Sequence, residues 1–326
     1  MQYVSLGSAG VKVSRICFGC MSFGNDNAWK LELDQARPLV QRAIDLGINF
    51  FDTANAYSAG RSEEITGECL KKYRDDVIIA TKVWGRMGNG PNDSGLSRSH
   101  ILPQIEASLK RLQTDHIDLY QTHRWDYTTP IAETLTTFDD LVHQGIVRYI
   151  GASSMFAWQF LTALQTSEKL GLEKFVTMQN HYNLVYREEE REMIPLCRQA
   201  GVALIPWSPL ARGFLTGKYK RGETPKTVRY ENERMEGRNY MADRYFRPED
   251  FDVVETAAAV GKEKGVSPSQ IGLAWLLHKG VTAPIIGVTK VQHVEEAVEA
   301  LEVKLDSDDV KRLEAPYKPH PVIGHE

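Results

Sequence analysis

Short runs of mainly apolar, often β-branched residues recur along the chain, and most are apolar over four or five consecutive positions. Uninterrupted apolar runs of this length predict strands that are covered on both faces. The pattern predicts eight such strands, at residues 13–19, 48–54, 77–83, 117–123, 147–153, 175–182, 202–208 and 283–289.

Between these runs, apolar residues recur at the spacing of an α-helix, as in the segment from Leu33 to Gly47, whose glycine is a stop signal. Strands that alternate with helices indicate a parallel sheet, and eight such units favour a (β/α)₈ TIM barrel. A doubly wound open sheet is the alternative, but no G-x-G-x-x-G motif follows any predicted strand. The other helices named by this pattern lie at 62–73, 97–112, 129–145, 187–201 and 267–280.

Two segments stand outside the regular alternation. The pattern of residues 3–14 predicts a β-hairpin with a GSAG turn, which we expect to plug one end of the barrel. The connection after the seventh strand contains two predicted helices, 249–262 and 267–279, and a highly charged remainder, 219–247. A long loop without secondary structure in a compact domain is usually functional, often as a lid, although an insertion without a role remains the alternative.

Composition and charge exclude several classes of function but do not identify one. The 326 residues fit a single domain over 1–326, and the net charge of −4 gives no electrostatic footprint for nucleic acid. The N-terminus lacks the features of a signal peptide, and no apolar run is long enough for a membrane helix, so we expect a cytoplasmic protein without a membrane partner. Cys17 and Cys20 form a CxxC pair inside a predicted strand without a second metal-spaced pair, so no metal or redox site is expected.

Polar residues gather where the predicted strands end, which is where a (β/α)₈ barrel places its active site. Asp52, Lys82 and His123 end the second, third and fourth strands. Each residue alone has a simpler interpretation: Asp52 could cap a helix, Lys82 could be a solvated loop charge, and His123 could be a structural histidine. Together they predict a site, because a lysine at the barrel mouth needs a carboxylate partner and Asp52 lies on the neighbouring strand.

Tyr57 follows Asp52 by five residues. A free phenol has a pKa of about 10 and is a poor acid at neutral pH. A nearby ammonium group would lower that pKa. The hypothesis is therefore that Asp52 holds Lys82 and that Lys82 tunes Tyr57.

The segments DTANAYSAGRSEE, IIATK, DLYQTHRWD, YIGASS, QNHYNL and PWSPLARGFLTGKY together resemble the aldo-keto reductase superfamily. The resemblance runs from the N-terminal hairpin to the C-terminal tail. It is nearest to the bacterial and fungal branches that also resemble potassium-channel β subunits, rather than to the mammalian aldose reductases. It implies a catalytic tetrad in which Tyr57 protonates a carbonyl oxygen as hydride arrives from a nicotinamide, His123 orients the carbonyl, and Lys82 and Asp52 set the pKa of the tyrosine.

The resemblance also implies a nicotinamide cofactor. It places the carboxamide against Ser153 and Gln179, with Asn180 adjacent and Ser154 where the family often has asparagine, and it stacks the nicotinamide ring on Trp207. The other positions that it assigns to the cofactor are Gly19, Cys20, Met21, Asp52, Ser208, Leu210, Gly213, Gly287, Thr289, Lys290 and His293.

The choice between NADPH and NADH depends on the helix that follows the last strand. A helix N-terminus with a lysine is suited to phosphate, and the resemblance implies that Thr289 and Lys290, with His293, hold the 2′-phosphate of NADPH. The family often has arginine near the position of His293 and asparagine at that of Ala297, and this chain departs from both. NADPH is favoured over NADH.

The expected substrate is a small carbonyl compound, an aldehyde or a ketone, and large aromatic residues in the mouth loops can form its pocket. Two other functions remain open: a dehydrogenase for alcohols or sugars, and an NADPH-binding regulatory module like the channel β subunits. The oligomeric state is also open. The candidate substrate residues are Trp29, Trp84 and Trp125, with Phe214 and 219–247 as a possible cover and Arg86 and Arg124 as contacts for a polar or anionic group.

Overall fold

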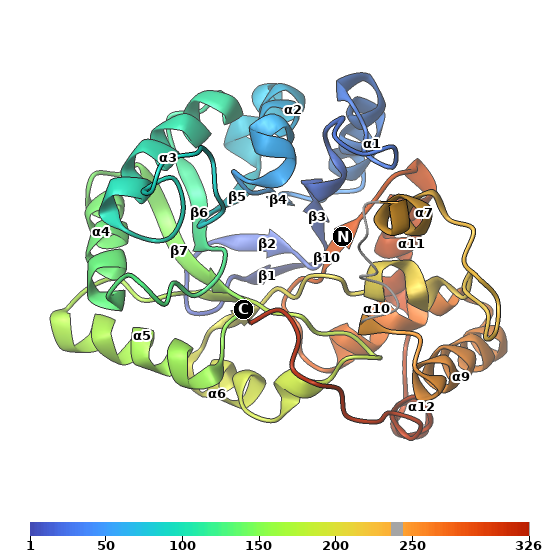
Figure 1. The fold of residues 1–326 in the computed structure, drawn as a ribbon. Helices are drawn as coiled ribbons and strands as arrows, with labels where there is room; N and C mark the ends of the chain where they lie inside the picture. Colours follow the sequence, from blue (N-terminus) through green and yellow to red (C-terminus); the bar gives the residue numbers. More distant parts are fainter. Residues whose placement is uncertain (236–243, 326) are drawn as a thin grey trace.

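A computed structural model, which describes residues 1–235 and 244–325, has eight parallel strands that alternate with helices in one ring (Figure 1). All eight predicted strands are present, but most are shorter than predicted, and the first begins only at Cys17 because residues 12–14 belong to the hairpin. The strands are β3 (Cys17–Gly19), β4 (Phe50–Asp52), β5 (Ile78–Val83), β6 (Ile117–Thr122), β7 (Val147–Ser153), β8 (Thr177–Gln179), β9 (Ala203–Leu204) and β10 (Ile285–Gly287).

The strands follow one another in parallel, in the order β10-β3-β4-β5-β6-β7-β8-β9. Backbone hydrogen bonds then join the two ends of this sheet, because the N–H of Thr282 donates to the carbonyl oxygen of Leu204 at 2.9 Å and that of Ile285 to Pro206 at 3.0 Å. The predicted (β/α)₈ barrel is confirmed.

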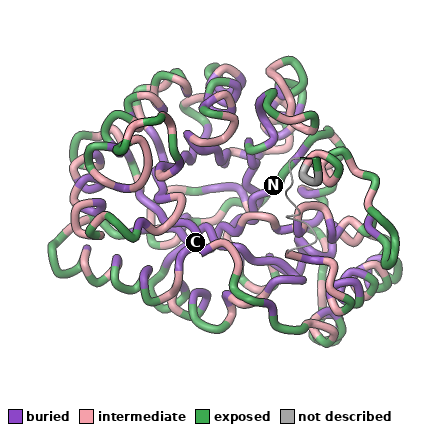
Figure 2. Tube along the Cα trace, viewed as in Figure 1, coloured by how far each residue is buried: buried purple, intermediate pink, exposed green. Residues whose placement is uncertain are grey.

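Helices form an outer layer around the strands, and the main hydrophobic core lies between the two layers (Figures 1 and 2). Glycine ends two of these helices in the left-handed conformation that is typical of helix C-termini, since Gly171 and Gly201 both have a φ of 67°. No helix in the described part of the chain is long and apolar enough to cross a membrane. The outer helices are α1 (Leu33–Asp45), α2 (Arg61–Leu70), α3 (Arg98–Leu112), α4 (Ile131–His143), α5 (Ala157–Leu170), α6 (Met193–Ala200), α9 (Pro248–Lys264), α10 (Pro268–His278), α11 (Val291–Glu299) and α12 (Ser307–Glu314).

The N-terminal hairpin plugs the barrel, as predicted. Its strands β1 (Tyr3–Ser5) and β2 (Lys12–Ser14) pair antiparallel. Leu6 and Val13 are fully buried in a small apolar cluster with Phe50 and Leu119 from the barrel strands. This end of the barrel is therefore filled with apolar side chains, which leaves the opposite, C-terminal end for chemistry.

The long connection after β9 is more ordered than the sequence indicated. Where we expected 219–247 to lack secondary structure, helix α7 (Val228–Met235) forms, while residues 236–243 lie outside the described part of the chain. Phe214 does not face the mouth as a cover; it is fully buried, and its ring packs near those of Tyr219, Tyr245, Phe246 and Phe251. This aromatic cluster anchors both ends of the connection to the barrel.

Candidate active site

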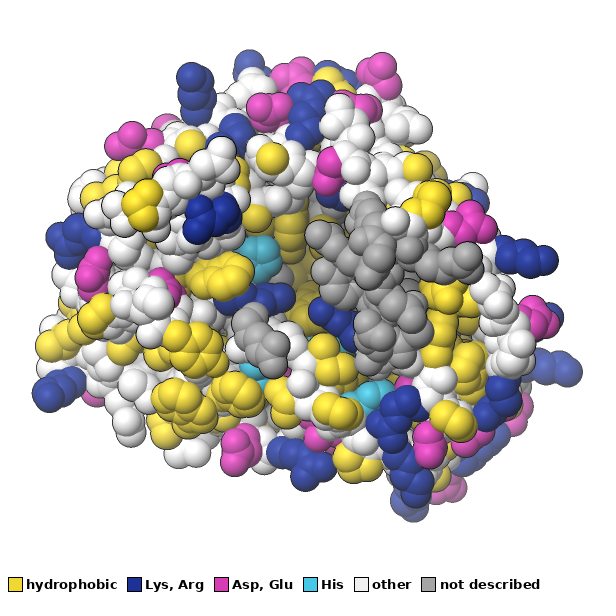
Figure 3. Space-filling model, in the orientation of Figure 1, with side chains coloured by type: hydrophobic (Ala, Val, Ile, Leu, Met, Phe, Trp, Pro, Cys, Tyr) yellow, Lys and Arg dark blue, Asp and Glu magenta, His cyan; other side chains and the backbone are white. Residues whose placement is uncertain are grey.

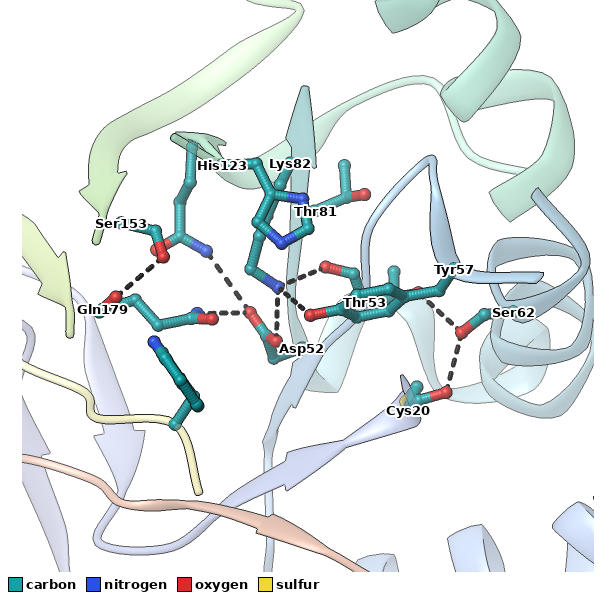
Figure 4. A network of polar contacts seen from close by, with 12 residues as sticks. Cys20, Asp52, Thr53, Tyr57, Ser62, Thr81, Lys82, His123, Ser153 and Gln179 are labelled. Carbon is teal, nitrogen blue, oxygen red and sulfur yellow. Dashed lines mark hydrogen bonds and ion pairs between the residues drawn. The ribbon is translucent and has the colours of Figure 1, made fainter. Parts of the chain in front are cut away.

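The strand register brings the predicted catalytic residues to the same end of the barrel. Asp52 ends β4, Lys82 lies in β5 beside Gln121 of β6, and His123 directly follows β6. Figure 4 shows their side chains pointing toward one another, with Tyr57 beside them. Figure 3 shows that the corresponding face of the molecule is hollowed near its centre, where basic and histidine side chains lie beside apolar ones.

Lys82 is the centre of this arrangement and its side chain has no exposed surface. Its Nζ donates to Asp52 Oδ1 at 2.6 Å, to the backbone oxygen of Thr53 at 2.7 Å and to Tyr57 Oη at 3.4 Å (Figure 4). The ammonium group therefore has three acceptors at fixed positions. The contact predicted between Lys82 and both Asp52 and Tyr57 is present.

The second oxygen of Asp52 also has partners, which were not predicted from the sequence. Gln179 Nε2 donates to Asp52 Oδ2 at 2.8 Å and Gln121 Nε2 donates to it at 3.3 Å. Gln121 could have been found, because side chains alternate along a strand and Gln121 shares the face of His123. These amides satisfy the carboxylate away from water and so fix the position from which it holds Lys82.

A strained turn places the phenol of Tyr57. Ser58 and Ala59 have φ values of 50° and 52°, in the left-handed region that non-glycine residues rarely occupy. Ser58 Oγ donates to the backbone oxygen of Phe23 at 2.9 Å and lies 2.8 Å from Lys30 Nζ, which donates to it. Strain of this kind persists where the surroundings determine the conformation, and it is frequent at functional sites.

The pKa of Tyr57 corrects the hypothesis made from the sequence. Burial raises the pKa of this phenol, and the charge of Lys82, although it acts in the opposite direction, does not outweigh the burial. The net shift is upward, so Tyr57 is protonated at neutral pH. Lys82 remains charged, because Asp52 and Tyr57 outweigh the effect of burial and its pKa lies above the ordinary value.

His123 lies next to Tyr57, with the two ring centroids 5.6 Å apart and the planes at 81°. Burial lowers the pKa of the imidazole well below its usual range, and the charges of Lys82 and Arg124 lower it further. His123 is therefore neutral at physiological pH. A neutral imidazole can donate one hydrogen bond to an oxygen at the mouth without carrying charge.

The predicted carboxamide and ring-stacking residues lie together at the ends of β7, β8 and β9. Ser153 Oγ donates to the backbone oxygen of Gln179 at 2.7 Å, and Trp207 Nε1 donates to Ser154 Oγ at 2.9 Å. The indole of Trp207 stacks on His181, with centroids 4.2 Å apart and an interplanar angle of 11°. The ring is thus held in a fixed plane, as a stacking platform requires.

Several features in this part of the barrel fit a bound dinucleotide. The predicted phosphate loop has left-handed backbone at Ser208, Arg212 and Gly213, with φ values of 51°, 56° and 94°. Asn180, which follows Gln179, is buried, and neither polar atom of its amide has a hydrogen-bond partner within the described chain. Successive backbone N–H groups in such turns form anion-binding concavities, and an unsatisfied buried amide indicates a ligand or a water molecule.

The start of α11 carries the predicted 2′-phosphate residues. Thr289 and Lys290 are exposed, and the backbone N–H of Thr289 lies 3.4 Å from His293 Nδ1. Burial lowers the pKa of His293, and the charges of Lys218 and Lys290 lower it further. Lys218 was not predicted as a site residue, because it comes from the long connection and its sequence position gave no sign that it approaches α11.

The other predicted cofactor residues lie around the same mouth. Gly19 ends β3, and a Cβ there would come within 2.9 Å of Ile285 Cγ2 and of the backbone oxygen of Ile286, so the glycine is required for strand packing whatever else it does. Cys20 is fully buried and its carbonyl accepts from Ser62, whereas Met21 is 37% exposed. Leu210 is partly buried at the phosphate loop and Gly287 is exposed at the end of β10.

The three predicted tryptophans are partly buried in mouth loops but differ in their neighbours. The guanidinium of Arg229, on α7, lies 4.6 Å from the ring centroid of Trp29, so the long connection reaches the loop that follows β3. The ring centroids of Trp125 and the exposed Trp158 lie 6.3 Å apart, and Trp84 packs against the main core. Arg86 is occupied within its own loop, where it donates to the carbonyl oxygens of residues 88 and 90.

Within the described residues, no group of histidine, cysteine and acidic side chains could hold a metal ion. Cys17 and Cys20 are buried free thiols, and burial raises the pKa of both. Thiols with raised pKa values are poor nucleophiles and poor metal ligands.

Comparison with known proteins decides the family. The model of the aldo/keto reductase family matches residues 15–318. A putative aryl-alcohol dehydrogenase of Schizosaccharomyces pombe is 40% identical over 99% of this chain and 97% of its own length. The versiconal hemiacetal acetate reductase of Aspergillus parasiticus is 40% identical over 98% of both chains.

The chain belongs to the aldo/keto reductase family. It is an oxidoreductase, and members of this family generally use NAD(P)H. The resemblance inferred from the sequence motifs is therefore confirmed. In this aldo/keto reductase, the buried phenol of Tyr57 lies at one side of the barrel mouth, and the left-handed turn after β9 and the buried Asn180 amide lie at the other.

Proposed function

We propose that this aldo/keto reductase reduces an aldehyde or a ketone to the alcohol, with NADPH as the hydride donor and Tyr57 as the proton donor. The observation that carries the proposal is the buried chain of contacts from Asp52 through Lys82 Nζ to the phenol oxygen of Tyr57. A lysine without exposed surface that is held between a carboxylate and a phenol has no evident structural purpose at the mouth of a barrel.

Tyr57 and His123 together can bind and activate a carbonyl oxygen. The raised pKa of Tyr57 keeps its proton in place at neutral pH, and the lowered pKa of His123 makes the imidazole a neutral hydrogen-bond donor. Two donors that converge on one oxygen orient the carbonyl and stabilise the negative charge that develops on it. NADPH, when bound, supplies the hydride that reduces the carbonyl carbon.

Lys82 matters most when the proton leaves Tyr57. The phenolate that remains is a buried anion, which would be costly without a cation nearby. Lys82 Nζ lies 3.4 Å from the phenol oxygen and remains charged, so it stabilises the phenolate more than the phenol. Asp52 in turn keeps the ammonium group in position and charged. In this proposal the lysine lowers the barrier to proton transfer rather than the resting pKa of the tyrosine.

The preference for NADPH over NADH rests on the charges near α11. Lys218, Lys290 and His293 approach one another at the start of the helix, where backbone N–H groups also favour an anion. A 2′-phosphate would meet two ammonium groups there, whereas the hydroxyl of NADH would leave them without a counterion. Ser153, Gln179 and Trp207 are proposed to hold the nicotinamide, and residues 208–213 the pyrophosphate.

Oxidation of an alcohol is the second candidate, and the names of several relatives favour it. Several are putative aryl-alcohol dehydrogenases. The same residues would act in reverse, with Tyr57 accepting the proton of the alcohol, but this requires the phenolate. Because the pKa of Tyr57 is raised, oxidation should be slow at neutral pH and should increase in alkaline solution.

The test is to follow the absorbance of the reduced nicotinamide while NADPH and NADH are offered with aliphatic aldehydes, benzaldehydes, ketones and quinones. Turnover with NADPH on any of these carbonyls supports the reductase. Absence of turnover on all of them, with aryl alcohols oxidised by NADP⁺ at neutral pH, would replace it with the dehydrogenase. NADPH binding without turnover in either direction would replace both with a binding module.

A further inference from the structure

Arg124 is a cation at the barrel mouth that the proposed chemistry does not use. It directly follows His123 at the end of β6, and its guanidinium is partly buried. Its Nη1 donates to the backbone oxygen of His123 at 2.6 Å, and no carboxylate of the described residues lies within ion-pair distance of it. A guanidinium has five N–H donors, so this one hydrogen bond leaves most of the hydrogen-bonding capacity of Arg124 unused within the described residues.

Three other arginines at low exposure in the same protein show the contrast. Arg74 pairs with Asp118 at 2.8 Å, Arg111 with Glu63 at 2.7 Å and Arg187 with Glu190 at 2.7 Å. These three side chains are between 11% and 17% exposed, and each has a carboxylate within the chain. Withdrawal of a charge from water is costly without a counterion. Arg124 has no such partner among the residues that the structure describes.

The charges around Arg124 make the mouth more positive still. It interacts electrostatically with Tyr57, whose pKa its charge lowers, and with Arg244 at the far end of the long connection. The guanidinium of Arg244 in turn lies 5.6 Å from the ring centroid of Trp207. Burial and the neighbouring Arg244 both lower the pKa of Arg124. The positive charge of Arg244 near Arg124 makes this place beside the phenol of Tyr57 more favourable for an anion.

We infer that Arg124, with Arg244, binds an anionic group of the substrate, so that this enzyme prefers carbonyl compounds that also carry a carboxylate. A carboxylate matches the fork of a guanidinium and can accept two parallel hydrogen bonds from it. This inference rests on the proposed reductase function, because it places the anion beside the carbonyl that Tyr57 protonates. It leaves the reacting groups unchanged and adds a contact that selects among carbonyl compounds.

The test compares matched acid and ester substrates. The ortho, meta and para carboxybenzaldehydes and their methyl esters have the same aldehyde and differ in charge. For at least one isomer, we expect kcat/KM of the acid to exceed that of its ester by about tenfold or more, the effect of one charge-assisted hydrogen-bonded pair. In Arg124→Gln this acid-to-ester ratio should fall to about one, whereas Arg124→Lys should retain part of it.

A matched control is Arg148→Gln, which removes an exposed guanidinium on β7 whose hydrogen bond goes to a nearby turn, to the oxygen of Gly145. Its acid-to-ester ratio should equal that of the unaltered enzyme. Equal treatment of acids and esters by the unaltered enzyme would overturn the inference. So would an Arg124→Gln variant in which both substrates slow equally while the alkaline limb of the pH profile moves, because Arg124 would then only tune Tyr57.

A binding measurement separates failure of the inference from failure of the proposed function. Calorimetric titration with benzoate and with benzamide, in the presence of NADP⁺, needs no turnover. Benzoate that binds about tenfold more tightly than benzamide, with the difference lost in Arg124→Gln, supports the anion site even if no carbonyl is reduced. Robust carbonyl reduction without any benzoate preference would leave the reductase in place and remove the anion site.

Discussion

The buried ion pair on one side of the barrel mouth and the buried amide on the other differ in how fully their polar atoms are satisfied. At the ends of β4, β5 and β6, Asp52 and Lys82 are buried and every one of their charged atoms has a partner at short distance. At the ends of β8, β9 and β10, the Asn180 amide has no partner in the described chain, and the turn after β9 has left-handed backbone. The Asp52–Lys82 ion pair is complete in itself, although Thr122 Oγ1 at the end of β6 has no partner in the described chain, and the other side is shaped for something that binds.

This difference indicates a division of labour. Catalytic groups act best when they are already in place, because reorganisation during the reaction costs rate. A cofactor that enters and leaves must instead find donors that its own phosphates and amide can satisfy. We therefore expect substitutions on the β4–β6 side to change turnover and stability, and substitutions on the β8–β10 side to change cofactor binding.

The largest effect should come from Tyr57→Phe. Removal of the hydroxyl removes the proposed proton donor and leaves the ring, so we expect kcat for carbonyl reduction to fall about a thousandfold. NADPH binding, measured by quenching of protein fluorescence, should stay within about twofold. A variant that retains more than a few per cent of the rate would show that another group donates the proton.

Tyr73→Phe is the matched control for this change. Tyr73 also loses a hydroxyl that is hydrogen-bonded, in this case to Gln41 Oε1 at 2.5 Å, on the outer surface of the barrel. Its kcat should stay close to that of the unaltered enzyme. A comparable loss in Tyr73→Phe would mean that kcat responds to stability rather than to the acid group.

Lys82→Met should give the next largest effect and should affect both turnover and stability. The carboxylate of Asp52 would stay buried without its cation, and breaking one partner of a buried pair costs about 3–5 kcal/mol. We expect kcat to fall about a hundredfold and the midpoint of thermal unfolding to decrease. The double variant Asp52→Leu with Lys82→Met should recover part of the stability and none of the activity.

The fold was predictable because its signals are local and repeated. Eight apolar runs separated by helical periods specify a (β/α)₈ barrel, and β7 was predicted with its observed bounds. Short strands such as β9, with two residues, were predicted too long because an apolar run shows where a strand lies and not where pairing stops. Helix α7 was missed because its surroundings are charged, so no apolar stripe marked it.

The residues at the mouth also differ in whether they could be predicted from the sequence. Asp52, Lys82 and His123 could be placed from the sequence because each ends a strand of a regular barrel, and strand ends converge. Lys218 and Arg244 could not, because both lie in the long connection and their positions depend on how that segment crosses the mouth. The pKa of Tyr57 was also assigned in the wrong direction, since the sequence indicated its charged neighbour but not the extent of its burial.

On the cofactor side, Lys218→Ala and Lys290→Ala should each raise KM for NADPH about tenfold and leave KM for NADH nearly unchanged. The reason is that only NADPH carries a 2′-phosphate, the group that we propose these ammonium groups contact. Lys110→Ala, in the last turn of α3, removes an exposed lysine elsewhere and should change neither constant. An equal rise for both cofactors would assign the lysines to the pyrophosphate or to the loop itself.

The smallest expected effect is that of pH: the rate of carbonyl reduction should not change across the neutral range. Tyr57 must be protonated to act as the acid, and a group with a raised pKa stays protonated until the pH rises through that value, so activity should decline only in alkaline solution. His123 must be neutral, and its lowered pKa keeps it so until the pH falls well into the acid range. The measurement is kcat/KM for one aldehyde as a function of pH, with NADPH saturating. A decline centred near the ordinary pKa of histidine would show that His123 titrates at the mouth, and it would make the β4–β6 side less isolated from water than its hydrogen bonds indicate.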